Sequence, residues 1–110
     1  MPRAHLGEFE HVVLLSVLRL GERAYGVPIR EEIERRAGRK VTIGALYATL
    51  DRLEAKGYLH SWFADPTPQR GGRSKRYFKL LPAGEQALAS YKAMLDRMWL
   101  GVRLKGGESV

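Results

Sequence analysis

Residues 42–59 read TIGALYATLDRLEAKGYL, and this stretch decides the fold. Leucines recur at helical spacing at Leu46, Leu50 and Leu53, and Thr42 is of a residue type that caps helix N-termini. Gly57 ends the pattern, and an aromatic-rich segment follows at once. The stretch therefore predicts a short amphipathic helix that leads directly into a β-strand.

Two further helical patterns precede this stretch, over residues 8–20 and from about residue 27 to residue 37, and a glycine follows each. The second pattern predicts one buried stripe, made of Ile29, Ile33 and Ala37. It also predicts ion pairs on the opposite, solvated side, Glu31 with Arg35 and Glu32 with Arg36.

Downstream, residues 58–63 and 75–81 are predicted strands around a loop rich in proline, glycine and arginine. Pro82 suits the first turn of a last helix, which runs to about Leu100. The order α-α-α-β-β-α predicts a mainly α (α+β) winged helix-turn-helix fold. We expect residues 1–81 to form the DNA-binding domain, residues 82–102 a C-terminal helix packed on it, and residues 103–110 a flexible tail.

The chain is basic, and its excess charge is concentrated. Lysine and arginine number 19 against 12 acidic residues, which gives a net charge of +7. Five of these seven excess charges lie in residues 66–79, which contain no acid. Such a patch favours a polyanionic partner, because phosphates neutralised by the protein release their counterions. The alternative is a solvated loop that only keeps the protein soluble.

The predicted helix at residues 43–56 has small residues on the outside of its first two turns, which lets a backbone approach the floor of a major groove. The candidate DNA-binding residues of this segment are Thr42, Gly44, Ala45, Tyr47, Ala48, Thr49 and Arg52. Candidates in the basic hairpin, suited to phosphates or a narrow minor groove, are Arg70, Gly72, Arg73, Lys75 and Arg76. The alternative is that the small face packs on another helix and that Tyr47 is a core aromatic.

The last helix has a heptad-spaced apolar seam, which predicts pairing between two chains. The candidate dimerisation residues are Leu88, Tyr91, Leu95, Met98, Trp99 and Val102. The alternative is that this seam folds back on the first helix of its own chain. Met98 and Trp99 also suggest a flat site for a small aromatic effector at the dimer centre, although such a stripe is more often plain core.

Three segments resemble the PadR family of bacterial winged-helix transcriptional regulators: residues 24–29 (AYGVPI), residues 41–59, and residues 73–80 (RSKRYFKL). The resemblance covers about residues 6–88 and implies a homodimer that binds an inverted repeat in promoter DNA, usually as a repressor. It implies that the helix after Thr42 reads DNA, that the hairpin forms the wing, and that the last helix makes the dimer interface. The composition, without cysteine or a run long enough to span a bilayer, separately predicts a cytoplasmic protein.

Other classes of function find little support in the sequence. There is no cysteine, and the three histidines, His5, His11 and His60, share no metal-ligand spacing. No nucleophile with a general base is recognisable, so we expect neither catalysis, nor a metal, nor a cofactor. The apolar run Val12–Leu20 is too short to span a bilayer. The remaining alternatives are a non-specific nucleic-acid binder and a winged helix that binds an acidic protein partner.

Overall fold

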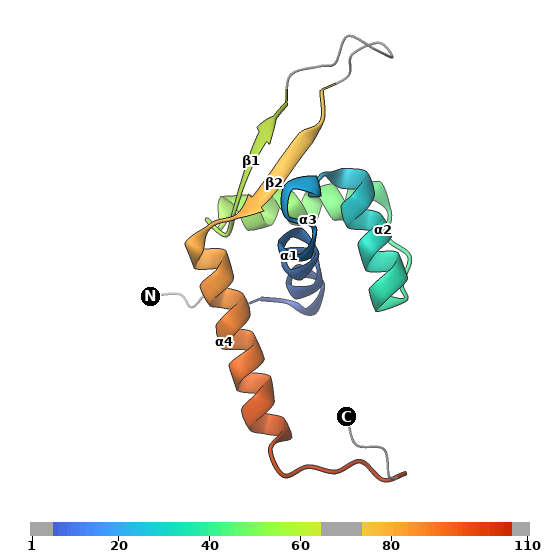
Figure 1. The fold of residues 1–110 in the computed structure, drawn as a ribbon, viewed down its shortest axis with the longest axis vertical. Helices are drawn as coiled ribbons and strands as arrows, with labels where there is room; N and C mark the ends of the chain where they lie inside the picture. The colour runs from blue at the N-terminus through green and yellow to red at the C-terminus, as the bar shows by residue number, and fades with distance from the viewer. Residues whose placement is uncertain (1–5, 65–73, 107–110) are drawn as a thin grey trace.

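The computed structural model describes residues 6–64 and 74–106. Three α-helices are followed by a two-stranded antiparallel sheet and a fourth helix (Figure 1), which confirms the predicted order and fold class. The elements are α1 (Glu8–Leu20), the short 3-10 helix η1 (Gly21–Arg23), α2 (Gly26–Ala37), α3 (Ile43–Ala55), β1 (Leu59–Phe63), β2 (Arg76–Leu80) and α4 (Pro82–Trp99).

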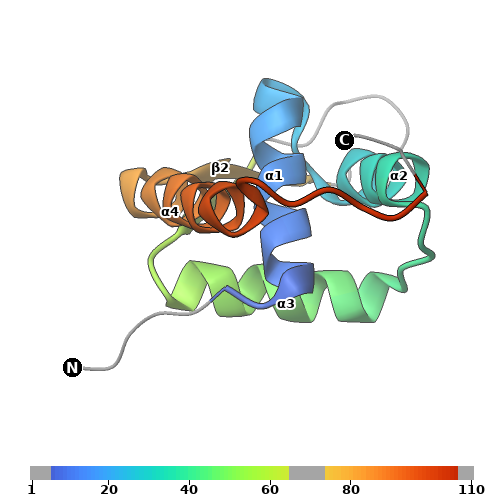
Figure 2. The same cartoon turned by 90° about the horizontal axis from the view of Figure 1, so that it is seen from below.

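The core forms where α1 crosses α3 and packs beside α2 and β2. Figure 2 shows α1 running crosswise to α3, with α2 and α4 on either side of it. The predicted leucines of α3 are fully buried, as are Leu14 of α1 and Phe78 of β2. Burying a side chain of this size contributes roughly 1.5–3 kcal/mol, so this cluster fixes α3 firmly against α1.

The hairpin is short, and β2 joins it to the residues before α2. In its register Leu59 pairs with Leu80 and Phe63 with Arg76. An isolated bridge joins Tyr77 to Tyr25, and the Phe78 amide donates to the Ala24 carbonyl at 2.9 Å. These bonds tie the sheet to the start of α2.

α4 is anchored at its first turns and then leaves the body of the protein (Figure 1). The Leu81 amide donates to the Tyr58 carbonyl at 2.9 Å, and Gly84 lies so close to this carbonyl that a Cβ atom would come within 2.3 Å of its oxygen. Leu88 is the last buried residue of the helix. The second half of α4 therefore presents its apolar residues to solvent in the single chain.

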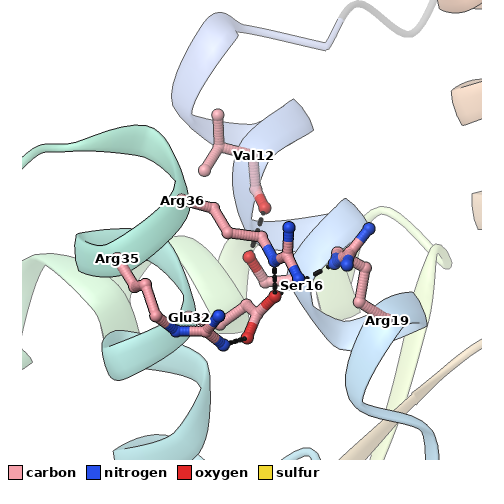
Figure 3. Close-up of polar contacts among 6 residues, drawn as sticks. All are labelled: Val12, Ser16, Arg19, Glu32, Arg35 and Arg36. Carbon is pink, nitrogen blue, oxygen red and sulfur yellow. Dashed lines mark hydrogen bonds and ion pairs between the residues drawn. The ribbon is translucent and has the colours of Figure 1, made fainter.

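The expectation of a solvated charged face on α2 is wrong for Glu32. Its side chain is only 7% exposed and pairs with Arg35 and Arg36 of α2 and with Arg19 of α1 (Figure 3). Burial raises the pKa of Glu32, but the hydrogen bonds and charges of the three guanidinium groups outweigh this and lower it. Arg35 pairs with Glu32 in place of the predicted Glu31. Because the helix wheel cannot show that α1 supplies a third arginine, the sequence alone did not predict this cluster.

The buried stripe of α2 also ends earlier than predicted. Ile29 and Ile33 lie in the core, whereas Ala37 is exposed. The reason is that Ala37 is the last residue of the helix, and Gly38 reverses the chain there with a φ of +67°.

Candidate nucleic-acid interface

The N-terminal half of α3 presents small residues to solvent. Thr42 caps the helix, since its Oγ1 accepts from the Ala45 amide at 3.1 Å, as predicted for this residue type. Gly44, Ala45 and Ala48 are exposed, and a Cβ atom built on Gly44 would meet nothing within 4 Å. Among residues 6–64 and 74–106, this face is therefore left open to a close approach by another molecule.

Two of the sequence candidates on α3 point away from this face. Tyr47 is half-buried, with its hydroxyl so close to Gly26 that a Cβ there would lie 2.3 Å from it, and its ring is 6.3 Å from that of Phe78. Thr49 is 3% exposed, and its Oγ1 accepts from the Arg52 guanidinium at 3.3 Å. Tyr47 thus follows the core alternative, and the Thr49 hydroxyl contacts Arg52 and is not presented to solvent.

Glu10 of α1 lies buried beneath the second half of α3. Its carboxylate accepts from Arg52 at 3.1 Å and from Lys56 at 3.0 Å, and it also accepts from the Gly7 amide at the start of α1. Burial raises the pKa of Glu10, but these hydrogen bonds outweigh it and hold that pKa below the usual range. Arg52 remains 53% exposed in its side chain, so it is oriented by Glu10 and still accessible.

Of the hairpin candidates, the structure describes Lys75 and Arg76, while Arg70, Gly72 and Arg73 lie outside the described residues. Lys75 is exposed, with its ammonium 4.8 Å above the Tyr25 ring. Arg76 is only 22% exposed in its side chain and pairs with Asp51 and Glu54 of α3. Lys75 is therefore available to an anion, whereas Arg76 is neutralised by acids within the protein.

The outer face of the hairpin carries a row of aromatic rings. His60 stacks on Trp62 with ring centroids 5.9 Å apart, Trp62 stacks on Tyr77 at 6.0 Å, and Tyr77 meets Tyr25 at 5.2 Å. The sequence pattern predicted His60, Trp62 and Tyr77 only as parts of strands. His60 and Trp62 are two residues apart on β1, and Trp62 pairs with Tyr77 of β2, so this spacing is the signal that places the three rings on one face.

The candidate dimerisation residues lie along α4 and continue just past its end. Leu88 is buried and Tyr91 half-buried, whereas Leu95, Met98, Trp99 and Val102 are 37%, 69%, 49% and 54% exposed. Between α1 and α4 lies a cavity of about 700 Å³, whose apolar walls include Leu15, Leu18, Leu88, Leu95 and Trp99. The seam thus contacts α1 only through its first residues, and the rest has no cover within the described part of the chain.

The described residues contain no group of three histidine or acidic side chains placed to hold a metal ion. Within the same residues, no helix combines the length and the apolar character needed to cross a membrane.

Comparison with known proteins identifies the family to which this chain belongs. Residues 14–90 match the transcriptional regulator PadR-like family. A curated relative, transcriptional regulator Rv3488 of Mycobacterium tuberculosis (strain ATCC 25618 / H37Rv), is 37% identical over 87 residues, which cover 77% of this chain and 73% of that protein.

Solved structures agree with this assignment. A PadR-like transcription factor from Bacteroides fragilis superposes with a TM-score of 0.67 at 26% identity, covering 82% of each chain. A Streptococcus transcriptional regulator gives a TM-score of 0.64 at 26% identity, covering 82% of this chain and 83% of the other.

The family and these relatives are regulators of transcription and not enzymes, as predicted. The exposed face of α3 and the basic hairpin are thus parts of a DNA-binding winged helix, and the chain belongs to the PadR-like family of transcriptional regulators.

Proposed function

We propose that this regulator is a cytoplasmic homodimer that represses transcription by binding an inverted-repeat promoter site. In this proposal α3 enters the major groove of each half-site and the hairpin contacts phosphates or the adjacent minor groove. The observation that carries the proposal is the open face of Gly44, Ala45 and Ala48, because a helix can approach base edges closely only where its side chains are small.

The proposed DNA-contacting residues differ in their roles. Thr42, Gly44, Ala45 and Ala48 would approach bases and phosphates, and the helix N-terminus adds free amides and a partial positive charge. Arg52 is the candidate for guanine or phosphate, since Glu10 and Thr49 fix its guanidinium without covering it. Lys75 would contact phosphate as a point charge.

The homodimer is supported by the uncovered seam on α4. An apolar stripe of this kind favours a second copy of the helix, which would also set two α3 helices at the spacing of two half-sites. The division into a DNA-binding unit at residues 1–81 and a dimerisation helix at residues 82–102 is part of this proposal. A small aromatic effector near Met98 and Trp99 stays a prediction of the sequence.

Selection of bound sites from random duplex DNA, followed by salt-titrated affinity measurements, tests the proposal. We expect one two-fold symmetric motif, bound at least roughly a thousandfold more tightly than random DNA. A non-specific nucleic-acid binder would enrich no motif and would lose affinity steeply with salt. A protein-interaction module would retain no DNA at all, and either result would contradict the proposal.

Lys75→Ala gives a further check on the hairpin. Removal of one ammonium–phosphate interaction should lower the slope of log K against log salt by about one and should weaken binding to all sequences alike. An unchanged slope would remove Lys75 from the interface.

A further inference from the structure

Arg76 connects the base of the hairpin to α3. It is the first residue of β2 and pairs with Phe63, the last residue of β1. Its guanidinium lies 3.0 Å from the Asp51 carboxylate and 2.9 Å from the Glu54 carboxylate, and its Nε donates to the Ser61 hydroxyl at 3.2 Å. One side chain thus contacts both strands and two turns of the helix.

Glu54 completes this connection from the side of α3. It accepts from the Ser61 amide at 3.1 Å and from the Ser61 hydroxyl at 2.7 Å, in addition to Arg76. The Ser61 hydroxyl bond comes first among the effects that lower the pKa of Glu54, with Arg76 adding to it, so the carboxylate stays ionised at neutral pH. Glu54 therefore contacts the middle of β1 directly and the start of β2 through Arg76.

The charge of this network is unfavourable for a DNA-binding surface. Two carboxylates surround one guanidinium, so Arg76 has no net charge left to offer to phosphate. Electrostatics alone would favour the removal of either acid from a face that approaches DNA. The presence of Asp51 and Glu54 therefore points to a structural role, in which they hold Arg76.

The hairpin is held on one face and along one edge. Arg76 reaches α3 from one face of the sheet, while Tyr77 forms an isolated bridge with Tyr25, just before α2, along the edge of β2. A two-stranded sheet with no further strand has little orientation of its own. Attachment to α3 on one face and to the residues before α2 along the edge of β2 fixes its angle relative to the exposed face of α3.

We propose that Glu54 and Arg76 are positioning residues, which hold the hairpin at the angle where Lys75 and α3 reach the same duplex. This inference rests on the proposed function. It makes Arg76 a residue that acts through the hairpin, and not the phosphate ligand that its place in the basic segment suggested.

Glu54→Gln tests the proposal, because positioning and electrostatics predict opposite signs. We expect the variant to bind the selected operator at least about fivefold more weakly than the wild type, as for the loss of one coupled interaction. Glu31→Gln is the matched control, since it removes one carboxylate of α2 that has no ion pair among the described residues. The control should bind as tightly as the wild type or slightly more tightly.

A double-mutant cycle separates positioning from a general loss of structure. If Glu54 orients Lys75, then Lys75→Ala should cost less affinity in the Glu54→Gln background than in the wild type. Thermal unfolding, measured by circular dichroism in the same buffer, ensures that affinities are compared below the melting transition of each variant. A general loss of structure would reduce affinity without this non-additivity.

Arg76→Lys provides a second variant that keeps the positive charge. A phosphate ligand would retain most of its affinity as lysine, whereas a lysine cannot bridge two carboxylates and a hydroxyl as a planar guanidinium does. We expect a loss comparable to that of Glu54→Gln. Because the displaced hairpin also takes Lys75 away from phosphate, the salt slope should fall as it does for Lys75→Ala.

The inference is overturned if Glu54→Gln binds as tightly as Glu31→Gln, or if the cycle is additive. Failure of the proposed function would appear differently, as a wild-type protein that prefers no DNA sequence.

Discussion

Replacing Gly44 by leucine should leave the fold intact and impair DNA binding. Gly44 lies in the first turn of α3, is exposed, and has no atom within 4 Å of the position that a Cβ would take. The substitution meets no steric barrier, and it removes the helix penalty of glycine, about 1 kcal/mol at most. We therefore expect the free energy of unfolding to stay the same or to rise by up to about 1 kcal/mol.

The same leucine would stand between α3 and the floor of the major groove. Each hydrogen bond to a base edge that the added distance breaks costs about 1–3 kcal/mol, so we expect the affinity for the selected operator to fall roughly 10- to 100-fold. Urea unfolding followed by circular dichroism gives the stability, and fluorescence anisotropy with a labelled operator gives the affinity.

Ala83→Leu is the matched control, because Ala83 is also exposed and occupies the corresponding position in the first turn of α4. It should alter neither quantity. If Gly44→Leu binds the operator as tightly as Ala83→Leu does, then α3 does not enter the groove and the reasoning is refuted.

Three further outcomes follow from the packing and the charges. Leu95→Asp should convert the dimer to monomers in sedimentation experiments, because it places two carboxylates in the seam; a persisting dimer would show that the seam is used within one chain. Gly84→Ala should destabilise the fold by about 1–3 kcal/mol, since its Cβ would collide with the Tyr58 carbonyl, and an unchanged melting temperature would contradict that packing. Because the pKa of Glu10 is lower in the folded protein than its usual value of 4.5, its carboxylate stabilises the fold above pH 4.5, and this contribution is lost as the pH falls through the folded-state pKa. Glu10→Gln should therefore reduce the change in the free energy of unfolding between pH 7 and pH 3, measured by urea unfolding at each pH.

The helices and strands of this fold could be predicted from the sequence because hydrophobic spacing and helix-ending residues determine where they begin and end. The bounds of the two strands and of α3 and α4 agree with the predictions to within about a residue, and Thr42 caps α3 as expected. Hydrophobic spacing, glycines and prolines act over a few residues, so they can be read without knowledge of the tertiary structure.

The polar part of the site could not be predicted in the same way, because its partners are distant in the sequence. Arg52 meets Glu10 across 42 positions, and Arg76 meets Glu54 across 22. A helix wheel shows Thr49 on the flank of α3 but not that the fold buries it. Charge in the basic segment predicted that Arg76 contacts phosphate, whereas its guanidinium pairs with two acids of α3.

The most direct test of the central claim uses the absence of cysteine from the chain. A single cysteine placed at Ala48, on the exposed face of α3, can carry a chelated iron that cleaves nearby DNA, and the same group at Ser90 on α4 serves as the control. If α3 lies in the major groove, the Ala48 probe cuts the selected operator within each half-site and the Ser90 probe does not. Cleavage by the Ser90 probe alone, or equal cleavage by both, would contradict the account.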